Sequence, residues 1–368
     1  MKYTELDTPV VIIDKDIMMS NIKFMQDYAN RKGVALRPHT KTHKIPEISL
    51  LCEAAGAKGI TVAKVGEAEV MAAAGLKDIF IANEIVGEEK FKRIIKLAET
   101  IDISFGLDSI EQANLINKAF EGVKPAEVVI EIEVGENRSG MLEEDEFINL
   151  LNHLKDNCPN INLRGVFSHD GSSYNAKDIE ECKEIHLTAQ KRTLQFVEIA
   201  KGMGYNFSVV SIGSTPSMLF DFPILEGVTE IRPGTYVLMD ASMSAAYGNL
   251  DMAAVTVLAT VISRPTAERV ILDVGAKGIT MQTRTKGITA VKGMGIIKNF
   301  DDVHIFDVFD EHAIIYNKKF RDTVRVGDKV EIIPVHVCPM MNLYNKAYVV
   351  QNGEVIDEYV IAGRGKLQ

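Results

Sequence analysis

The stretch "RPHTKTHK", from Arg37 to Lys44, places two lysines and two histidines where a strand should end. The apolar run "VAL" before it predicts a buried strand. A lysine amine held at such a strand end can react with a bound carbonyl compound or accept a proton. Lys41 lies nearer the strand, whereas we expect Lys44 to begin the next helix. Lys41 is therefore the favoured reactive amine and Lys44 its competitor, while His39 and His43 could either pack around a ligand or only finish the strand.

A second stretch, "SIGSTPS" at 211–217, has the composition of an anion-binding turn. Gly213 lets the backbone approach a ligand closely, and Ser214 and Thr215 offer hydroxyls and backbone N–H donors. Pro216 predicts that a short helix follows, so an ordinary helix N-cap without a ligand is the alternative interpretation.

A reactive lysine together with a phosphate site is what pyridoxal 5'-phosphate requires. The amine must be held near the ring aldehyde while the phosphate anchors the far end of the cofactor. A solvated basic loop is the alternative explanation for any single lysine, but the position of Lys41 at a strand end favours the cofactor.

A third stretch, "PVHVCPMMN" at 334–342, carries a candidate metal pair. His336 and Cys338 alternate, which predicts that both side chains point to the same face of a strand. An imidazole beside a thiolate suits Zn²⁺, and two ligands would leave coordination positions for water and substrate. A core histidine beside a buried free cysteine is the alternative.

The elements that must position these residues follow a regular rhythm. Eight short apolar runs, several of them β-branched and continuous, alternate with segments of helical spacing. This predicts an α/β fold, a (β/α)8 barrel over residues 11–240, with an open doubly wound sheet as the alternative. From 241 to 368, strand-like runs joined by turn signals predict a second, mainly β domain. The eight runs of the barrel lie at 34–41, 59–64, 78–83, 102–107, 126–134, 163–169, 207–213 and 230–239.

In a barrel, catalytic groups lie at the carboxyl ends of the strands, and phosphate tends to bind after strands seven and eight. The "SIGSTPS" turn follows strand seven, which supports a phosphate site there. Polar side chains at the other strand ends are Arg138, His169, Tyr174, Arg232 and Tyr236.

The composition of the 368-residue chain limits the classes of protein to which it can belong. A net charge of −10, from 41 basic and 51 acidic residues, argues against a nucleic-acid partner. No apolar run approaches the ~20 residues that cross a bilayer, and no signal peptide is visible. The four cysteines form no CxxC pair, so we expect reduced thiols in a soluble cytoplasmic protein.

Taken together, these motifs resemble the fold-type III pyridoxal phosphate enzymes, whose founder architecture is alanine racemase. More narrowly, they resemble the D-serine dehydratase / D-threonine aldolase branch. The resemblance implies that residues 1–10 join the β domain and that the protein is a homodimer whose two subunits both shape the active site. The matching stretches are "RPHTKTHK", "ITVAKVGEAEVM", "VGENRSG", "SHDGSSY", "SIGSTPS", "EIRPGTYVLMD", "EH" at 311–312 and "HVCPMMN", in order along nearly the whole chain.

The resemblance also implies a role for each site residue. Lys41 would be the Schiff-base lysine, and Arg138 would bond the phenolate oxygen of the ring. The turn Gly213–Ser214–Thr215 would hold the phosphate with help from Tyr236, and Arg232 would face the pyridine nitrogen. His336 and Cys338 would bind a divalent metal, and His169 and Tyr174 are pocket candidates by position.

The implied function is a lyase that depends on pyridoxal phosphate and a divalent metal and acts on β-hydroxy D-amino acids. Dehydration of D-serine to a keto acid and ammonia is favoured, because dehydratases of this branch tend to pair His-x-Cys with zinc. "SIGSTPS" also resembles the dehydratase version. The alternative is D-threonine aldolase, which releases glycine and an aldehyde and more often pairs His-x-Asp with manganese. "ITVAKVGEAEVM" and "YVLMD" favour the aldolase.

Two further readings stay open. An amino-acid racemase would need a second base, a tyrosine in the β domain, for which the sequence offers no clear match. A non-catalytic carrier of pyridoxal phosphate would be a lone barrel, which the large β domain and the HxC pair argue against.

Overall fold

The computed structural model describes residues 1–300 and 302–368 and divides into two compact units. The barrel unit comprises residues 25–41, 46–234 and 366–368, and the β unit comprises residues 1–24, 42–45 and 235–365. The first division falls within helix α1 (Lys15–Lys32). Each unit is described below by itself.

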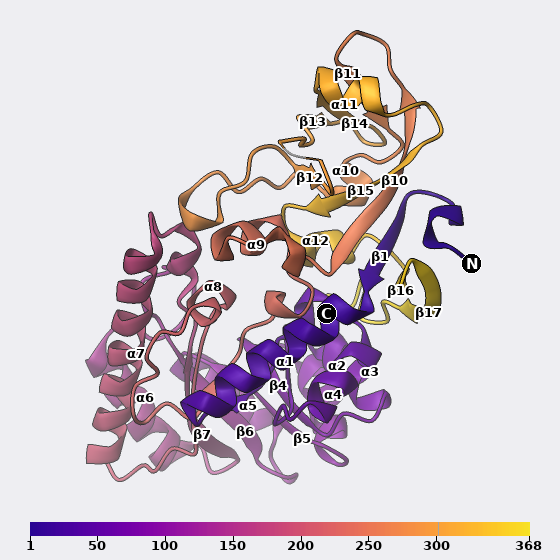
Figure 1. Ribbon diagram of the computed structural model, residues 1–368. Coiled ribbons are helices and arrows are strands. Elements are labelled where there is room, and N and C mark those ends of the chain that lie inside the picture. Colours follow the sequence, from indigo (N-terminus) through magenta and orange to yellow (C-terminus); the bar gives the residue numbers. More distant parts are fainter. Residues whose placement is uncertain (301) are drawn as a thin grey trace. The chain divides into compact units, whose positions relative to one another are not determined.

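Eight parallel strands form the sheet of the barrel unit, in the order β2-β9-β8-β7-β6-β5-β4-β3 (Figure 1). The ring closes between β3 and the end of β2, where Thr61 N–H donates to Pro38 O at 2.8 Å and His39 bridges Thr61. The strands are β2 (Ala35–Leu36), β3 (Ile60–Val62), β4 (Asp78–Glu84), β5 (Asp102–Leu107), β6 (Ala126–Ile132), β7 (Ile161–Ser168), β8 (Val209–Ile212) and β9 (Glu230–Ile231).

All eight predicted runs are confirmed as strands, and the (β/α)8 barrel with them. The first and last strands are shorter than expected, because Pro38 and Pro233 lack the N–H that a ladder needs. The strands read as continuous apolar runs because both of their faces are buried. Phe80, Val129 and Phe167 form one cluster, while their strand neighbours belong to the larger cluster that includes the helices.

The helices that follow the strands lie around the outside of the barrel (Figure 1). Some begin with a side-chain cap, as at Asp178, whose carboxylate accepts from Glu181 N–H at the start of α7. The helices are α2 (Pro46–Ala54), α3 (Val65–Ala73), α4 (Glu88–Ala98), α5 (Ile110–Ala119), α6 (Glu144–Asn157), α7 (Ile179–Gly202) and α8 (Thr215–Leu219), with 3-10 turns η2 (Thr40–Thr42) and η3 (Gly171–Asn175).

Arg37 forms a buried ion-pair cluster with two residues that begin strands. Its Nε donates to Glu230 at 2.8 Å, and its two terminal nitrogens donate to Asp78 at 2.6 and 3.1 Å. Gly59 makes room for this guanidinium, because a Cβ there would lie 2.8 Å from Arg37 NH1. The first residue of the "RPHTKTHK" stretch is therefore structural.

We expect Arg37→Met to lower the free energy of unfolding by about 3 kcal/mol, because it leaves the buried Glu230 carboxylate without its partner. Denaturant midpoints of the variant and the parent measure this loss. Arg93→Met is the matched control, because Arg93 pairs with the half-exposed Glu69 and its loss should cost about 1 kcal/mol or less. Equal losses in the two variants would contradict this account of Arg37.

The β unit contains a nine-stranded sheet, which confirms the mainly β character expected of it. The N-terminal strand β1 pairs antiparallel with β10 and parallel with β16. Asn352 and Gly353 both have positive φ and form the two-residue hairpin turn that "NG" predicts. The strands are β1 (Val10–Asp14), β10 (Val255–Ser263), β11 (Arg269–Leu272), β12 (Gly295–Ile297), β13 (Asp307–Val308), β14 (Ala313–Tyr316), β15 (Lys329–Pro334), β16 (Lys346–Gln351) and β17 (Glu354–Val360).

Short helices connect these strands. They are α9 (Ala241–Tyr247), α10 (Ala276–Ile279), α11 (Lys318–Thr323) and α12 (Val337–Met341), with 3-10 turns η1 (Tyr3–Glu5), η4 (Thr235–Val237), η5 (Leu250–Met252) and η6 (Gly287–Thr289).

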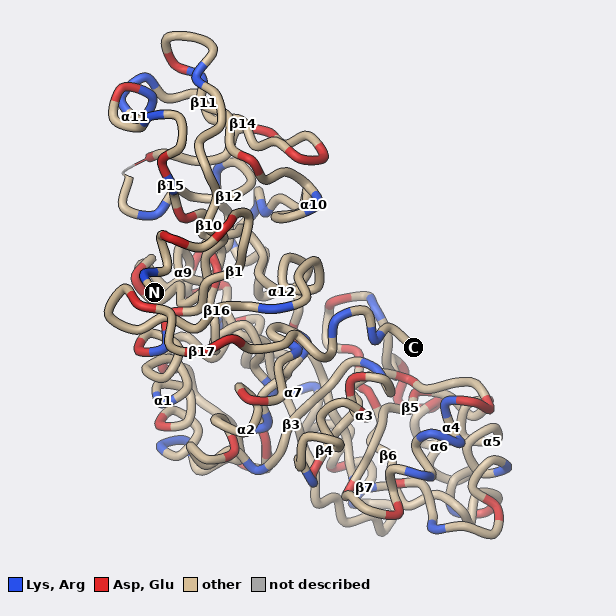
Figure 2. The backbone as a smooth tube through the Cα atoms, turned by 90° about the vertical axis from the view of Figure 1, so that its right-hand side faces the viewer, with Lys and Arg blue, Asp and Glu red and all other residues tan. Residues whose placement is uncertain are grey.

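Both signs of charge are spread over both units (Figure 2). In the described part of the chain, no helix combines the length and apolarity that a bilayer crossing requires.

Candidate active site

Lys41 lies in the turn η2, which follows β2 at the mouth of the barrel. Its side chain is half-buried, and its backbone N–H donates to His39 Nδ1 at 3.4 Å. Burial, together with the nearby charges of Lys41 and Arg232, lowers the pKa of His39 well below its ordinary value. The lysine predicted to be reactive is therefore held at a carboxyl strand end, with a neutral imidazole beside it.

The two histidines of the stretch shape the backbone around Lys41. His39 accepts the N–H of Lys41, and His43 Nδ1 accepts the N–H of Ile45 at 3.1 Å. Burial lowers the pKa of His43 to about 3, so this ring is also neutral. Both imidazoles act as local hydrogen-bond acceptors that set the course of the chain after β2.

Lys44 does not begin the next helix, and that expectation was wrong. Helix α2 begins at Pro46, and Lys44 has a left-handed φ of 57°. Pro46 disfavours a helical backbone at Ile45, the residue directly before it, so the helix does not extend back to Lys44. Its Nζ donates to Asn342 Oδ1 at 3.0 Å within the β unit. The amine of Lys44 is thus engaged in a structural contact, which favours Lys41 as the reactive group.

Arg138 is carried by a loop whose two ends are tied together. Glu133 N–H donates to Met141 O at 3.1 Å, and Met141 N–H donates to Glu131 O at 2.8 Å. Arg192 of α7 donates to Glu133 O at 2.7 Å and so connects the loop to this helix. The loop therefore holds Arg138 next to the end of β6.

Two carboxyl groups contact the guanidinium of Arg138, the buried Glu131 and the partly exposed Glu136, each at 3.3 Å. Glu131 accepts from Arg138 at 3.3 Å and from Ser139 Oγ at 2.6 Å. Burial, reinforced by Glu131, raises the pKa of Glu84. Burial alone would raise the pKa of Glu131 as well, but hydrogen bonds from Glu84 and Ser139 lower it. Within the Glu84–Glu131 pair, Glu84 is thus the protonated partner, and Glu131 keeps the negative charge that faces Arg138.

His169 follows the last residue of β7 and contacts the Gly213–Thr215 turn. Its Nδ1–H donates to Gly213 O at 2.8 Å, which fixes the tautomer. Burial, and then the charge of Lys41, lower the pKa of His169 to about 4, so the ring is neutral. The ring of Tyr174 lies 6.5 Å from it between centroids.

The turn after β8 has the geometry that its glycine predicts. Gly213 has a φ of +127°, and a Cβ at this position would lie 3.3 Å from Arg232 N. Ser214 precedes the predicted short helix, now α8, and Thr215 Oγ1 accepts from Gly234 N–H at 3.2 Å. The turn is tightly packed and tolerates no larger residue at 213.

Arg232 is a buried cation with part of its hydrogen-bonding capacity unused. Its NH2 donates to Ser168 O at 2.7 Å, and its guanidinium lies over the rings of Phe167 and Phe80. Its NH1 has no partner among the described residues. Burial lowers the pKa of this arginine to about 10. A buried donor without a partner suits a ligand that brings an acceptor, such as the nitrogen of a pyridine ring.

His336 and Cys338 do not alternate along a strand, and that expectation was wrong. Strand β15 ends at Pro334, His336 is the N-cap of helix α12, and Cys338 lies in the first turn of that helix. The reason is Pro339, which is tolerated in the first turn of a helix but not inside a ladder. His336 Nδ1 shares a hydrogen bond with Gln282 Oε1 at 2.9 Å.

Cys338 lies among hydroxyl groups. Its Sγ is 3.4 Å from Thr42 Oγ1 and 3.9 Å from Thr235 Oγ1. Within residues 1–300 and 302–368, no group of three His, Cys, Asp or Glu side chains could hold a metal ion. His336 and Cys338 could therefore supply only two protein ligands, with the other positions left to water or substrate. Tyr236 is buried in η4 of the same unit.

The structure brings five of the predicted sites together at the carboxyl ends of the barrel strands. They are Lys41, Arg138, His169, the Gly213–Thr215 turn and Arg232, linked by the contacts and mutual charge effects above. Tyr236, His336 and Cys338 belong to the β unit. The sequence reasoning missed Glu84, Glu131 and Asp170, although each lies at a predicted strand end and that position could have marked it.

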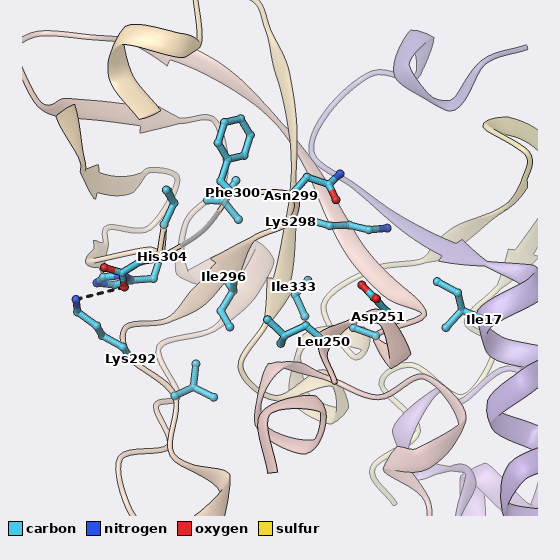
Figure 3. A pocket seen from close by; sticks show the side chains of 15 residues that line it. Ile17, Leu250, Asp251, Lys292, Ile296, Lys298, Asn299, Phe300, His304 and Ile333 are labelled. Atoms are coloured by element: carbon cyan, nitrogen blue, oxygen red, sulfur yellow. Dashed lines mark ion pairs between the residues drawn. The ribbon is translucent and has the colours of Figure 1, made fainter. Parts of the chain in front are cut away.

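A separate cavity of about 660 Å³ lies within the β unit (Figure 3). Apolar side chains such as Leu250, Ile296 and Ile333 line it, together with an ion pair between Lys292 and Asp302 at 3.8 Å. It contains none of the predicted site residues and is not the candidate active site.

Comparison with known proteins identifies the family of the chain. Residues 13–242 match the family model of the alanine racemase N-terminal domain, and residues 254–350 match the putative serine dehydratase domain. The chain is 32% identical over 365 residues to D-threonine aldolase of an Arthrobacter species, covering 98% of this chain and 93% of that protein. It is 36% identical over 260 residues to the D-threo-3-hydroxyaspartate dehydratase of Delftia sp. strain HT23, covering 70% and 68%.

Solved structures agree as well. D-threonine aldolase from Filomicrobium marinum superposes with a TM-score of 0.90 at 29% identity, covering 100% of this chain and 98% of that one. The protein therefore belongs to the D-serine dehydratase / D-threonine aldolase family of pyridoxal phosphate-dependent lyases, with an alanine racemase-like barrel.

Proposed function

We propose that this protein eliminates water from β-hydroxy D-amino acids such as D-serine, with the help of a divalent metal, and that hydrolysis of the resulting enamine gives a keto acid and ammonia. The observation that carries the proposal is the environment of Cys338. Its Sγ lies 3.4 Å from the hydroxyl of Thr42, the residue joined directly to Lys41 along the chain. A thiol and an imidazole two residues apart favour Zn²⁺ over Mn²⁺.

The residues of the barrel unit fit pyridoxal phosphate. The orphaned NH1 of Arg232 suits the pyridine nitrogen, Arg138 suits the phenolate oxygen, and the Gly213–Thr215 turn suits the phosphate. His169 and Tyr174 of the same unit would line the pocket. Tyr236, which belongs to the β unit, would assist at the phosphate as the family resemblance implies. When bound, the cofactor would delocalise the negative charge that develops on the α-carbon of the substrate.

The protein's own groups then have distinct tasks. Lys41 would anchor the cofactor covalently and, once released by the substrate, its amine would take the α-proton. Arg232 is a guanidinium that gives up its proton only at high pH, so it would donate to the ring nitrogen and keep it unprotonated. A ring with an unprotonated nitrogen would withdraw electrons less strongly, so the reaction would depend more on assisted departure of the hydroxyl. His336 and Cys338 would hold a metal whose Lewis acidity serves that departure.

Retro-aldol cleavage is the second candidate, and a specific observation favours it. The full-length relative at 32% identity is named a D-threonine aldolase. Such a reaction would break the bond between the α- and β-carbons and release glycine and an aldehyde. It would use the same residues, with the metal site assisting removal of the hydroxyl proton rather than loss of the hydroxyl. Mn²⁺ would be the alternative metal.

One assay separates these reactions. Purified protein is given D-serine, D-threonine or D-threo-3-hydroxyaspartate, with and without a chelator. We expect keto acid and ammonia from D-serine, and loss of this activity on chelation that added Zn²⁺ restores. Glycine plus acetaldehyde from D-threonine as the main products would establish the aldolase instead. Racemisation of D-alanine that the chelator does not affect would overturn the lyase proposal.

We also infer a cytoplasmic homodimer. The inference rests on the family resemblance and on the four cysteines, none of which forms a disulfide. Light scattering should give twice the mass of the chain, and a monomer that is fully active would contradict the dimer.

A further inference from the structure

A buried polar network lies beneath the Gly213–Thr215 turn and has no place in the chemistry above. It consists of Asp170, at the end of β7, and three serines, Ser173, Ser214 and Ser217. All four residues are at least 98% buried. Ser173 Oγ and Ser214 Oγ are 2.9 Å apart, Ser214 donates to Ser217 at 3.2 Å, and Ser217 donates to Asp170 Oδ2.

The carboxylate of Asp170 determines which group donates in each hydrogen bond of this four-residue network. Burial alone would raise the pKa of Asp170, but hydrogen bonds from His186 and Ser217 lower it far below its ordinary value. An ionised carboxylate can only accept, so Ser217 must donate to it. Ser217 then accepts from Ser214, and Ser214 in turn accepts from Ser173. The hydroxyl proton of Ser214 is thus committed to the network.

Two residues at helix N-caps give their side chains to this network instead of capping. Asp170 precedes η3 and Ser214 precedes α8, and neither side chain makes a cap hydrogen bond. Asp and Ser at these positions ordinarily accept from the backbone of the turn that follows. Their inward orientation joins the end of β7 to the turn after β8.

Stability does not account for the charge of Asp170. Its Oδ1 and the Nε2 of His186 are buried without a hydrogen-bond partner among the described residues. A buried charge that is only partly satisfied costs more free energy than a neutral group of the same shape. The arrangement is therefore better explained by what it holds in place.

We propose that Asp170 is a positioning residue for the phosphate-binding turn. Through Ser217 and Ser214 its carboxylate holds the backbone of Gly213–Thr215 in the shape that receives the phosphate of the cofactor. In this arrangement the backbone N–H of Ser214 would donate to the phosphate, because its hydroxyl already donates to Ser217. The inference rests on the proposed function, since that function assigns the phosphate to this turn.

The test compares pyridoxal phosphate with pyridoxal, which carries the same aldehyde without the phosphate. Binding of each to the full-length protein, freed of cofactor, is measured by absorbance. We expect Asp170→Asn to weaken pyridoxal phosphate roughly ten- to a hundredfold, the range for losing a hydrogen bond to a charged group. The affinity of the variant for pyridoxal should stay within about twofold of the parent's affinity, because a change confined to the Gly213–Thr215 turn leaves the binding of the aldehyde end intact.

Two further variants complete the design. Ser217→Ala keeps the carboxylate but breaks the chain, and should also lower the preference for pyridoxal phosphate. Ser49→Ala is the matched control, since Ser49 is a buried serine in α2 that contacts Met71 and lies outside the network. It should leave both affinities unchanged.

The outcomes are separable. If the parent prefers pyridoxal phosphate but Asp170→Asn shows the same preference, the inference about Asp170 is overturned and the proposed function stands. If the parent binds both compounds equally, the phosphate assignment in the proposed function is wrong, and the inference falls with it. If Asp170→Asn does not fold, Ser217→Ala decides, and an unchanged preference in that variant overturns the inference.

Discussion

Replacing Lys41 with alanine is expected to abolish the absorbance band near ~420 nm that marks a lysine amine joined to the aldehyde of pyridoxal phosphate. The same change should lower the lyase activity by roughly 10²–10⁴-fold or more, because it removes both the covalent anchor and the base that takes the α-proton. Absorbance spectra and initial rates measure the two effects independently.

Lys44→Ala is the matched control for this experiment. Lys44 lies three residues away, but its amine donates to Asn342 and its backbone is in the left-handed region. The absorbance band should therefore survive in this variant. Survival of the band in Lys41→Ala, with its loss in Lys44→Ala, would move the assignment to Lys44.

Cys338→Ala should lower bound metal and lyase activity together, while the absorbance band of the cofactor stays. The described residues supply only His336 beside this thiol, so loss of Cys338 removes half of the protein ligands. A tenfold to hundredfold loss is common even for residues that only support a ligand, so about 100-fold or more is expected here. Elemental analysis of the purified protein and rates with D-serine are the measurements.

Cys158→Ala is the control for the loss of a thiol, because Cys158 is a buried free cysteine of the barrel unit. It should retain both metal and activity. Cys338→Asp adds a sharper comparison, since an oxygen ligand is harder than a thiolate and should shift the metal preference from Zn²⁺ towards Mn²⁺. Full activity of Cys338→Ala without metal would refute a catalytic metal at this position.

Local patterns in the sequence were sufficient for the strands of the barrel unit, whereas they favoured a closed ring over an open sheet without deciding between them. Eight apolar runs, several of them β-branched, are separated by helical spacing and predict parallel strands buried on both faces, and each run contains a strand in the structure. Turns also follow from local residue types, since Gly213 and the "NG" pair at 352–353 have the positive φ that glycine and asparagine adopt readily. In each case the property belongs to a few neighbouring residues, so the sequence carries it directly.

Two predictions were wrong where a short pattern of residues is compatible with more than one kind of secondary structure. The alternation of His336 and Cys338 fits a strand, but Pro339 belongs to the first turn of a helix, and α12 forms instead. Lys44 was expected in a helix, yet it lies before Pro46 with a left-handed backbone. Short segments of this kind are decided by the partners that the rest of the chain supplies.

The sequence by itself determined that Lys41 stands at the carboxyl end of a barrel strand, because that position follows from the order of the strands. Only the tertiary structure decided how Lys41 is surrounded, because its neighbours come from strands far apart along the chain. It made His39 and His169 neutral, paired Glu84 with Glu131 beside Arg138, and connected Asp170 through Ser217 to the Gly213–Thr215 turn. Burial and long-range contacts produce each of these effects, and neither is a property of a local stretch of residues.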